Sequence, residues 1–579
     1  MLDHVSIKIV GPAGFGIKTT GLALAKFFMR QGFYVSAYTE YPSLIRGGHN
    51  TYQIEVSKKE VRGTRSTADV LFALSAESLE KEVANLAPGS TVILDSDIKI
   101  SGLAGINTLR KNKTKFISAP LVKSAKFIGS EVMKNSVGFG ILAGLFEQPF
   151  DKIKKILADF FKGEENIKQN QLAAKAGWEW FEEHKKEFDT IKLPKKNACS
   201  DKMLITGNQA CALGAVAANC QLYAAYPMTP ATEILHVLEA KQRETGMMVH
   251  QTEDEIAAIH AALGASFTGA RAACGTSGGG FALMNEGLSL AGMLELPLVL
   301  FEVMRPAPAT GNPTWTDQGD LSYVLHASHG EFPKVVLAPG SPEEAFVLTQ
   351  HAFDLADRFQ LPVIVLSDKY LGETSFTEEE ETLDEVLKIN RGEIILSENK
   401  IPKNYKRYLL TTDGISPRAI PGLAGGEHVA NSDEHDEFSF SDEGSKNRID
   451  QMDKRLKKLE GVRENIPLPK VYGPQKADIT LVAWGSTLGV LRDALEEFNS
   501  QSKKKANLVH FSYIWPLAKN IDKFLSKFKK LILVENNATG QLGKLIAQET
   551  GIQIKDKILK YDSRPFWTDE LVDKINKMF

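Results

Sequence analysis

Gln251-Thr-Glu-Asp-Glu255-Ile-Ala-Ala-Ile-His260-Ala-Ala-Leu-Gly-Ala265 is the most informative segment of this 579-residue sequence. Apolar residues recur at helical spacing from Ile256 to Ala265, and the segment is rich in alanine, which predicts a helix. Glu255 would stand at the start of this helix. A carboxylate there interacts favourably with the helix dipole, so Glu255 taken alone has a purely structural interpretation. Its neighbours in the sequence support a chemical one.

Two further segments follow predicted strands. Tyr226-Pro227-Met228-Thr229-Pro230 follows a strand over 222–225, and its prolines fix the loop so that the Thr229 hydroxyl is a rigid hydrogen-bond donor. Gly275-Thr276-Ser277-Gly278-Gly279-Gly280 follows a strand over 270–274 and would let a ligand approach the backbone closely. Open α/β sheets bind ligands outside the carboxyl ends of their strands, so both segments predict a ligand site.

A strand over 298–304 ends at Arg305 and is followed by a long loop over 306–320 that contains Thr314. An arginine at this end of a sheet can pair with the carboxylate of a 2-oxoacid through two parallel hydrogen bonds. We therefore expect Arg305 to lie at the same edge of the sheet as Thr229.

The N-terminal segment contains a predicted strand over 5–10, the turn Gly11-Pro-Ala-Gly14-Phe-Gly16, a helix over 19–31 and a strand over 33–38 that reaches Glu40. Glycines in such a turn let the backbone approach an anion at a helix N-terminus. A phosphate-binding P-loop is one interpretation, although Ile17 separates Gly16 from Lys18. A Rossmann dinucleotide site is another, with Glu40 suitably placed but the glycine order reversed. Tight packing without a ligand is the third.

A second glycine-containing loop, Arg46-Gly47-Gly48, follows shortly afterwards. Arginine beside two glycines suits a phosphate-bearing or nucleotide-like partner, because a guanidinium group binds phosphate through paired hydrogen bonds. A structural arginine in a turn is the alternative.

The composition restricts the class of protein. With 69 Lys and Arg against 72 Asp and Glu, the net charge is −3, so no global basic field indicates nucleic acid. The four cysteines contain no C-x-x-C pair, so we expect no metal or cluster site within this chain. The sequence shows no signal peptide and no long apolar run, which predicts a cytoplasmic protein without a membrane span.

The pattern of segments predicts an α/β protein with several doubly wound domains. We expect units at 1–195, 200–375 and 469–579, with a connecting segment at 376–468. In that segment Ile449, Met452, Leu456 and Leu459 repeat at helical spacing and predict one docking helix. In the last unit, 478–485 and 530–535 are expected to be buried parallel strands, with a helix over 488–499 between them.

Together these motifs resemble the 2-oxoacid:ferredoxin oxidoreductases, specifically an alpha subunit of the 2-oxoglutarate synthase type with a gamma domain fused at its N-terminus. The resemblance covers nearly the whole chain. It is carried by Tyr226–Pro230, where Met228 stands in place of the usual Ile, and by Gln251–Ile259, Thr276–Phe281 and Thr310–Thr314. Arg46-Gly47-Gly48 is similar to the gamma-domain motif.

The resemblance implies a fold and a set of roles. The domains would be gamma-like, thiamine diphosphate pyrimidine-binding and transketolase C-terminal-like. Glu255 would contact the aminopyrimidine as the catalytic residue, and Thr229, Arg305 and Thr314 would bind the 2-oxoacid. The cofactor-binding set would also include Tyr226, Pro227 and Ser277, with Arg46, Gly11, Gly14 and Gly16 on the coenzyme A side.

Two features of that family are missing from this sequence. It contains neither a G-D-G loop for the diphosphate and Mg²⁺ nor a cysteine set for an iron–sulfur cluster. We therefore expect a beta subunit to supply the diphosphate site, Mg²⁺ and a [4Fe-4S] cluster. The complex would convert a 2-oxoacid, coenzyme A and oxidised ferredoxin into acyl-CoA, carbon dioxide and reduced ferredoxin.

Several alternatives stay open. A nicotinamide-dependent dehydrogenase would rest on Gly11 to Gly16 and Glu40, but would leave the 226–320 motifs unexplained. A non-catalytic scaffold would have no need for Glu255, Thr229 and Arg305 together. Within the family, 2-oxoglutarate is the favoured substrate, and pyruvate or a branched-chain or aryl 2-oxoacid is the alternative.

Overall fold

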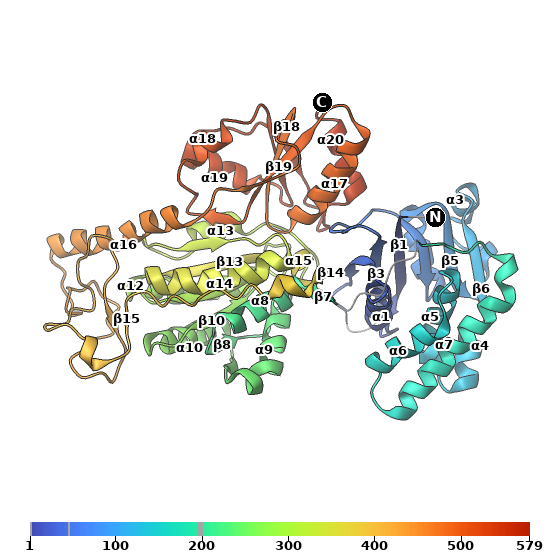
Figure 1. Cartoon of the computed structure of the whole chain (residues 1–579), viewed down its shortest axis with the longest axis horizontal. Coiled ribbons are helices and arrows are strands. Elements are labelled where there is room, and N and C mark those ends of the chain that lie inside the picture. Colours follow the sequence, from blue (N-terminus) through green and yellow to red (C-terminus); the bar gives the residue numbers. More distant parts are fainter. Residues whose placement is uncertain (1–2, 45–46, 194–200) are drawn as a thin grey trace.

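The computed structural model describes residues 3–44, 47–193 and 201–579. Within these residues the strands form an eight-stranded, a seven-stranded and a five-stranded sheet and one two-stranded pair. Figure 1 shows the N-terminal region at one end of the molecule, the middle region beside it and the C-terminal region above both. The expected α/β fold with several domains is confirmed.

The eight-stranded sheet runs in the order β6-β5-β4-β1-β3-β2-β14-β7 and is mixed. β1 is parallel to β4 and antiparallel to β3, which is in turn antiparallel to β2. The expected first and second strands are both present, but they are not neighbours because β3 lies between them. The strands of this region are β1 His4–Ala13, β2 Tyr34–Glu40, β3 Gly47–Ser57, β4 Ala68–Ala73, β5 Leu86–Asp95 and β6 Lys115–Ala119.

Helices from the same region cover this sheet: the longer helices share one core with β1 to β6, whereas the short ones lie in a second core with residues of β1, β4 and β5. The glycines of α5 allow close helix packing, since a β-carbon at Gly140 would lie 1.9 Å from the Ala174 carbonyl oxygen of α7. The longer helices are α1 Ile17–Met29, α4 Leu121–Ile128, α5 Lys134–Leu145, α6 Phe150–Phe160 and α7 Glu164–His184, and the short ones are α2 Ala76–Glu82 and α3 Ile106–Lys111.

Two strands from later in the chain complete the same sheet. β14 (Ser375–Glu379) pairs with β2 on one side and with β7 (Lys202–Thr206) on the other. A side chain of β14 also bonds to β2, because Thr377 Oγ1 accepts a hydrogen bond from the Val35 amide at 2.9 Å. The N-terminal and middle regions are therefore joined by strand pairing, and the predicted division of the chain into units stays a prediction.

The seven-stranded sheet runs in the order β20-β12-β13-β11-β10-β8-β9. The six strands from the middle region pair in parallel, and β20 (Tyr513–Trp515) adds an antiparallel edge from the C-terminal region. The parallel strands are β8 Leu222–Ala225, β9 Met248–Gln251, β10 Ala272–Thr276, β11 Leu298–Met304, β12 Val335–Leu337 and β13 Pro362–Asp368. The strands expected over 222–225 and 298–304 are present with those bounds.

The two faces of this sheet are covered by different helices. One core contains residues of α8 Gly207–Ala217, α9 Thr232–Thr245 and α14 Pro342–Phe359. The other contains α10 Glu255–Phe267, α11 Gly278–Leu283, α12 Asn285–Met293 and α13 Leu321–His326, together with much of the C-terminal region. Leu298, Leu300 and Met304 of β11 lie in this second core, so alternation places Glu302 on the same face.

The five-stranded sheet runs in the order β17-β19-β18-β21-β22. β18 is parallel to both β19 and β21, so the two expected strands are indeed buried parallel neighbours. The elements are β17 Lys470–Tyr472, β18 Ile479–Trp484, β19 Ala506–Phe511, β21 Leu531–Glu535, β22 Asp556–Leu559, α17 Thr487–Gln501, α18 Ile521–Leu525, α19 Gln541–Thr550 and α20 Thr568–Asn576.

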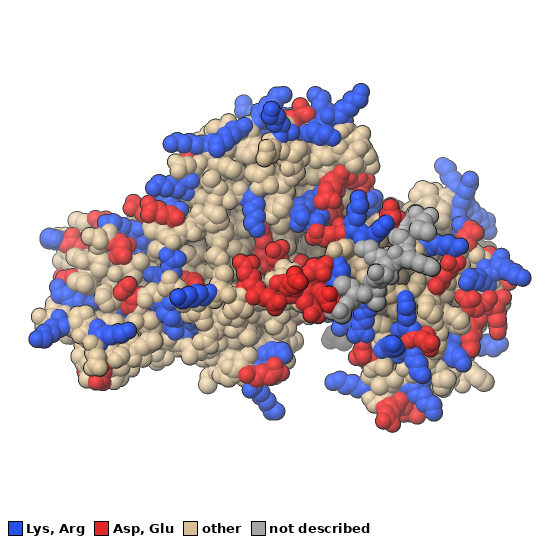
Figure 2. Space-filling view, viewed as in Figure 1, with Lys and Arg blue, Asp and Glu red and all other residues tan. Residues whose placement is uncertain are grey.

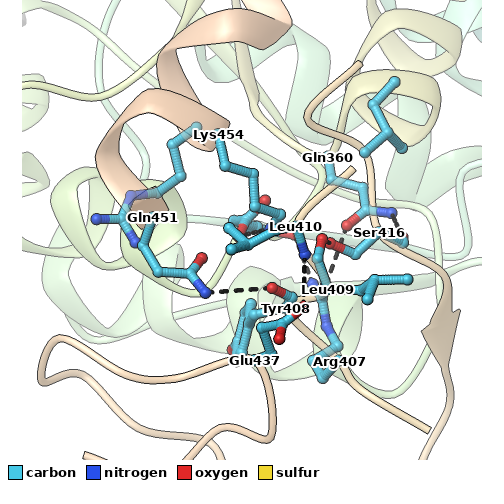
Figure 3. A network of polar contacts seen from close by, with 12 residues as sticks. Gln360, Arg407, Tyr408, Leu409, Leu410, Ser416, Glu437, Gln451 and Lys454 are labelled. Carbon is cyan, nitrogen blue, oxygen red and sulfur yellow. Dashed lines mark hydrogen bonds and ion pairs between the residues drawn. The ribbon is translucent and has the colours of Figure 1, made fainter. Parts of the chain in front are cut away.

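The connecting segment contains the expected helix, α16 (Ser445–Asn465), but the helix docks through a different face. Ile449 is 60% exposed, whereas Gln451, Lys454, Arg455 and Lys458 are buried. The reason is a buried carboxylate. Glu295 lies 2.5 Å from Lys454 Nζ and also pairs with Lys458. Figure 3 shows Lys454 and Gln451 of α16 facing the polar network around Arg407 and Tyr408, in which Gln451 Nε2 donates to the Tyr408 carbonyl.

Figure 2 shows Lys and Arg spread over all three regions of one face, with acidic side chains gathered near its centre. Among the helices of the described ranges, none combines the length and the apolar character that crossing a membrane requires. The remaining short elements are β15 Ile394–Ile395, β16 Arg418–Ala419 and α15 Lys369–Glu373.

Candidate active site

Glu255 is the first residue of α10, and its side chain is buried, with 3% of the residue exposed. Asp254 caps the helix, because its Oδ1 accepts a hydrogen bond from the Ala257 amide at 2.7 Å. Glu255 is therefore not needed as the cap. Its Oε1 is buried without a hydrogen-bond partner among the described residues. A buried carboxylate oxygen left without a partner is costly, which indicates that a ligand completes it.

The glycine-rich segment after β10 closes over this carboxylate. This segment, which the sequence predicts to follow the strand as a glycine-rich turn, contains a short helix, α11, that begins at Gly278. A β-carbon at Gly280 would lie 2.4 Å from Glu255 Oε1 and 2.1 Å from Thr276 Oγ1. Ser277 is fully buried, and its Oγ also has no partner in the described part of the chain. Glycine at position 280 thus makes room for the carboxylate of Glu255.

The loop after β8 lies beside the same group. Thr276 Oγ1 is 3.8 Å from the sulfur of Met228. Arg305 Nη1 donates a hydrogen bond of 2.7 Å to the carbonyl oxygen of Thr229. The structure therefore brings Arg305 to the 226–230 loop, as expected. Tyr226 is 41% exposed at the edge of this group.

Thr314 is buried, and its hydroxyl donates a 2.5 Å hydrogen bond to the Tyr41 carbonyl of the N-terminal region. The Tyr41 hydroxyl in turn donates to the Glu373 carboxylate at 3.0 Å. Thr314 thus ties the 306–320 loop to the N-terminal region, and its role in binding a substrate stays a prediction.

Sequence reasoning did not single out a group of buried acids around Asp320, whose charges act on one another. Burial raises the pKa of Asp317 to about 7 and those of Asp320 and Asp368 to about 6. Burial, with the nearby charges of Asp320 and Asp368, raises the pKa of Glu302 well above its usual value, and both Glu302 oxygens lack partners among the described residues. One signal was available, because Glu302 interrupts the apolar run of β11.

The N-terminal glycine turn has a different structure from the one expected. β1 continues through Gly11, which pairs with Asn50 of β3. Gly14 and Gly16 have φ values of 87° and 71°, a conformation that favours glycine. Asn135 of α5 donates to the Phe15 carbonyl and fills the space beside Gly16, whereas no heavy atom of the described residues lies within 4 Å of a β-carbon placed on Gly14. Among the three glycines of this turn, Gly14 is therefore the one with space beside it, as far as the described residues show.

The loop that carries the second glycine motif lies next to this turn. Ala13 pairs with Gly47 at the start of β3, and Arg46 lies outside the described residues. His49 Nε2 lies 2.6 Å from the buried carboxylate of Glu82, which also pairs with Lys8 at 2.7 Å. The two glycine motifs are therefore adjacent in space, although they are far apart in the printed sequence.

The arrangement does not support a dinucleotide site. A Rossmann unit needs its first two strands side by side and in parallel, with a free acidic residue at the end of the second. Here β3 separates β1 from β2. The carboxylate of Glu40 lies 3.5 Å from Arg564 Nε of the C-terminal region. Glu40 is thus engaged in holding two regions together.

Two protein-family profiles match the chain. Residues 6–180 match pyruvate ferredoxin/flavodoxin oxidoreductase, and residues 213–454 match pyruvate flavodoxin/ferredoxin oxidoreductase, thiamine diP-binding. A 2-oxoacid:ferredoxin oxidoreductase subunit alpha from Sulfolobus sp. is 33% identical over 99% of this chain and 97% of its own length. The chain belongs to the 2-oxoacid:ferredoxin oxidoreductases. The Sulfolobus relative is an alpha subunit by its name, and the gamma-domain identity of residues 1–195 stays a prediction.

Other members of the oxidoreductase family agree with this result. The 2-oxoglutarate oxidoreductase subunit KorA of Mycobacterium tuberculosis is 28% identical over 98% of this chain and 91% of its own length. The solved 2-oxoglutarate:ferredoxin oxidoreductase of Magnetococcus marinus is 30% identical, covers 100% of both chains and superposes with a TM-score of 0.91. That structure holds 2-oxoglutarate, coenzyme A and succinyl-CoA. The oxidoreductase fold of this chain therefore extends over its full length.

Proposed function

We propose that this chain supplies the pyrimidine half of a thiamine diphosphate site in a complex that oxidatively decarboxylates a 2-oxoacid, with 2-oxoglutarate as the favoured substrate. The carrying observation is the buried, unpartnered Oε1 of Glu255, which lies against a glycine where any larger residue would collide with it. This group fits the aminopyrimidine end of the cofactor, because a buried carboxyl there can hydrogen-bond a ring nitrogen. When bound, thiamine diphosphate supplies the carbon nucleophile and takes up the electron pair released by decarboxylation.

The residues of this chain would orient the reactants. Glu255 would hold a proton between its Oε1 and the pyrimidine ring. Arg305 would bind the 2-oxoacid carboxylate with the N–H groups that it does not spend on the Thr229 carbonyl. Thr229 and Thr314 would line the same site, with Tyr226, Pro227 and Ser277 around the cofactor. The walls that α10 and α11 form on one side would keep water from the reacting atoms.

The other half of the site would come from a beta subunit. This sequence lacks a G-D-G loop, and Cys211, Cys220 and Cys274 are buried thiols, with burial raising the pKa of Cys211 and of Cys220 to about 12. Such thiols do not serve as ligands of a cluster. The beta subunit would supply the diphosphate site, Mg²⁺, a [4Fe-4S] cluster and the contact with ferredoxin, and the complex would work in the cytoplasm.

Coenzyme A would approach from the N-terminal region. Support comes from the adjacency of the two glycine motifs and from the open position of Gly14. Arg46 would pair with a phosphate of coenzyme A, while Gly11 and Gly16 shape the turn. The products would be acyl-CoA, carbon dioxide and reduced ferredoxin, with succinyl-CoA expected from 2-oxoglutarate.

The test uses the chain produced together with its beta subunit and a panel of 2-oxoacids, namely 2-oxoglutarate, pyruvate, a branched-chain acid and an aryl acid. The wild-type complex should reduce ferredoxin fastest with 2-oxoglutarate, and the isolated chain should reduce none. Glu255→Gln should lower kcat by at least about 100-fold, the scale of a lost acid–base group. Glu253→Gln, an exposed residue two positions earlier, is the matched control.

Each result has a separate meaning. Near-normal activity of Glu255→Gln would reject the assignment of Glu255. Turnover by the isolated chain would reject the divided site. A preference for pyruvate or for another 2-oxoacid would replace 2-oxoglutarate and leave the rest of the proposal in place.

A further inference from the structure

The 306–320 loop follows β11 of the seven-stranded sheet in sequence, but the C-terminal region holds the loop in place. Gln318 is fully buried within this loop. Its backbone N–H donates to the Asn536 carbonyl at 2.8 Å, and its side-chain Nε2 donates to the Trp484 carbonyl at 2.9 Å. Its Oε1 accepts from the Asn536 amide at 3.0 Å, and its carbonyl oxygen accepts from Asn537 Nδ2 at 3.1 Å.

All of these partners lie at the carboxyl ends of β18 and β21. Trp484 is the last residue of β18, and Asn536 and Asn537 directly follow β21. Both side-chain heteroatoms and both backbone groups of Gln318 are therefore used by one rigid sheet edge. Breaking such a buried set leaves donors and acceptors unsatisfied, which gives the contact a single well-defined geometry.

A second glutamine from the same region holds the next residues of the loop. Gln541 is the first residue of α19. Its Nε2 donates to the Gly319 carbonyl at 2.6 Å, and its Oε1 accepts from the Ser322 amide at 2.7 Å. Asp320 therefore lies between two points that the C-terminal region fixes, one on each side. We call Gln318 and Gln541 the glutamine clamp.

Asp320 connects the clamp to the site. Its Oδ2 is so close to Gly278 of α11 that a β-carbon on the glycine would lie 2.6 Å from it. The same Oδ2 is buried without a hydrogen-bond partner among the described residues. The charges of Asp320 and Arg305 act on each other, and Arg305 is the residue that reaches the Thr229 carbonyl. A shift of the loop would move a carboxyl group relative to the guanidinium.

We infer that Gln318 is a positioning residue for the 2-oxoacid site, through which the C-terminal region fixes the carboxyl group of Asp320 against Gly278 of α11 and so sets the electrostatic field in which Arg305 offers its guanidinium group to a substrate carboxylate. The inference rests on the proposed function, because it takes the 2-oxoacid to bind Arg305. It gives the C-terminal region a part in substrate binding, although that region contributes none of the residues expected to touch the substrate.

The test compares Gln318→Met with Thr480→Val in the complex with the beta subunit. Methionine keeps the length of glutamine and removes both side-chain hydrogen bonds. Thr480→Val removes a buried hydrogen bond of 2.6 Å to Asn507 in the same sheet, on β18, without touching the loop. Both variants should lower the melting temperature, so Thr480→Val controls for a general loss of stability.

Only Gln318→Met should change the site. We expect its KM for the 2-oxoacid to rise about 10-fold or more, with kcat and the KM for coenzyme A changed less, because small displacements of positioning groups have effects of this size. Amide hydrogen exchange in the 306–322 peptide should become faster in Gln318→Met and stay unchanged in Thr480→Val. This readout does not depend on turnover.

Gln541→Met serves as the second variant if Gln318→Met does not fold, since it releases only Gly319 and Ser322. An unchanged KM together with unchanged exchange in the 306–322 peptide would overturn the inference while the wild-type complex stays active. A wild-type complex that oxidises no 2-oxoacid would overturn the proposed function itself, and the two failures are therefore distinguishable.

Discussion

Glu255 and Gly280 are packed so closely that a β-carbon on the glycine would lie 2.4 Å from the Oε1 of the glutamate. The contact joins two helices that are separate in the sequence. α10 carries the carboxylate, and the first turn of α11 leaves the space that it occupies. This contact gives the most direct test of the site.

Gly280→Ala should lower the activity of the complex by about 100-fold, because the new methyl group displaces the carboxylate from the place where the pyrimidine would meet it. Alanine favours a helix over glycine, so α11 itself should persist. Gly279→Ala is the matched control, since no heavy atom within residues 3–44, 47–193 and 201–579 lies within 4 Å of its added β-carbon. Equal activities of the two variants, measured by ferredoxin reduction, would contradict the placement of Glu255.

Arg305→Ala should raise the KM for the 2-oxoacid by about 10- to 100-fold, the range of a lost charge-assisted hydrogen bond. Arg305→Lys should recover part of this loss, because lysine keeps the charge and lacks the planar pair of donors. The KM for coenzyme A, measured on the same preparations, is the internal control. If the KM values for both substrates stay at the wild-type level, Arg305 does not bind the 2-oxoacid.

Asp317 should make the chain less stable as the pH rises. Burial raises its pKa from 3.8 to about 7 in the folded state, so the folded chain keeps a proton that the unfolded chain has already released. The stability of the wild type relative to Asp317→Asn should therefore fall between about pH 4 and pH 7 and then level off. Thermal melting across this range checks the trend, with the exposed Asp573→Asn as control. A constant difference between wild type and Asp317→Asn would reject it.

Lys454→Met should loosen α16, because it leaves Glu295 buried with one cation fewer. Removing one partner of a buried ion pair typically costs about 3 kcal/mol or more. Amide hydrogen exchange along α16 measures the local loss. Lys446→Met breaks an exposed pair with Asp450 on the same helix and should leave exchange unchanged. Similar exchange in both variants would show that the ion pair between Lys454 and Glu295 is not what fixes the helix.

Local patterns predicted the parts of the fold that local physics controls. The strand at 222–225, the strand at 298–304 and the helix that begins at Glu255 are visible in the sequence, since each combines an apolar pattern with a turn signal. The grouping of Thr229 and Arg305 followed from one rule, that parallel strands end at the same edge.

Other features depend on contacts between distant residues, which periodicity cannot show. The insertion of β3 between β1 and β2 is a choice of pairing, and nothing in the apolar pattern of either strand encodes it. The docking face of α16 was predicted wrongly because Ile449 and Leu456 form the apolar stripe, while the buried Glu295 selects the lysines on another side. Gln318 was visible only as one polar residue in a long loop.

The pairing of β14 with β2 has a consequence for how such a protein can be divided between genes. The Val35 amide and Thr377 Oγ1 are bonded although they lie 342 positions apart. In an organism that encodes the two regions in separate genes, this strand pairing would become an interface between two polypeptides. Each polypeptide would then be synthesised with an unpaired strand edge. The two polypeptides would have to associate rapidly to avoid aggregation.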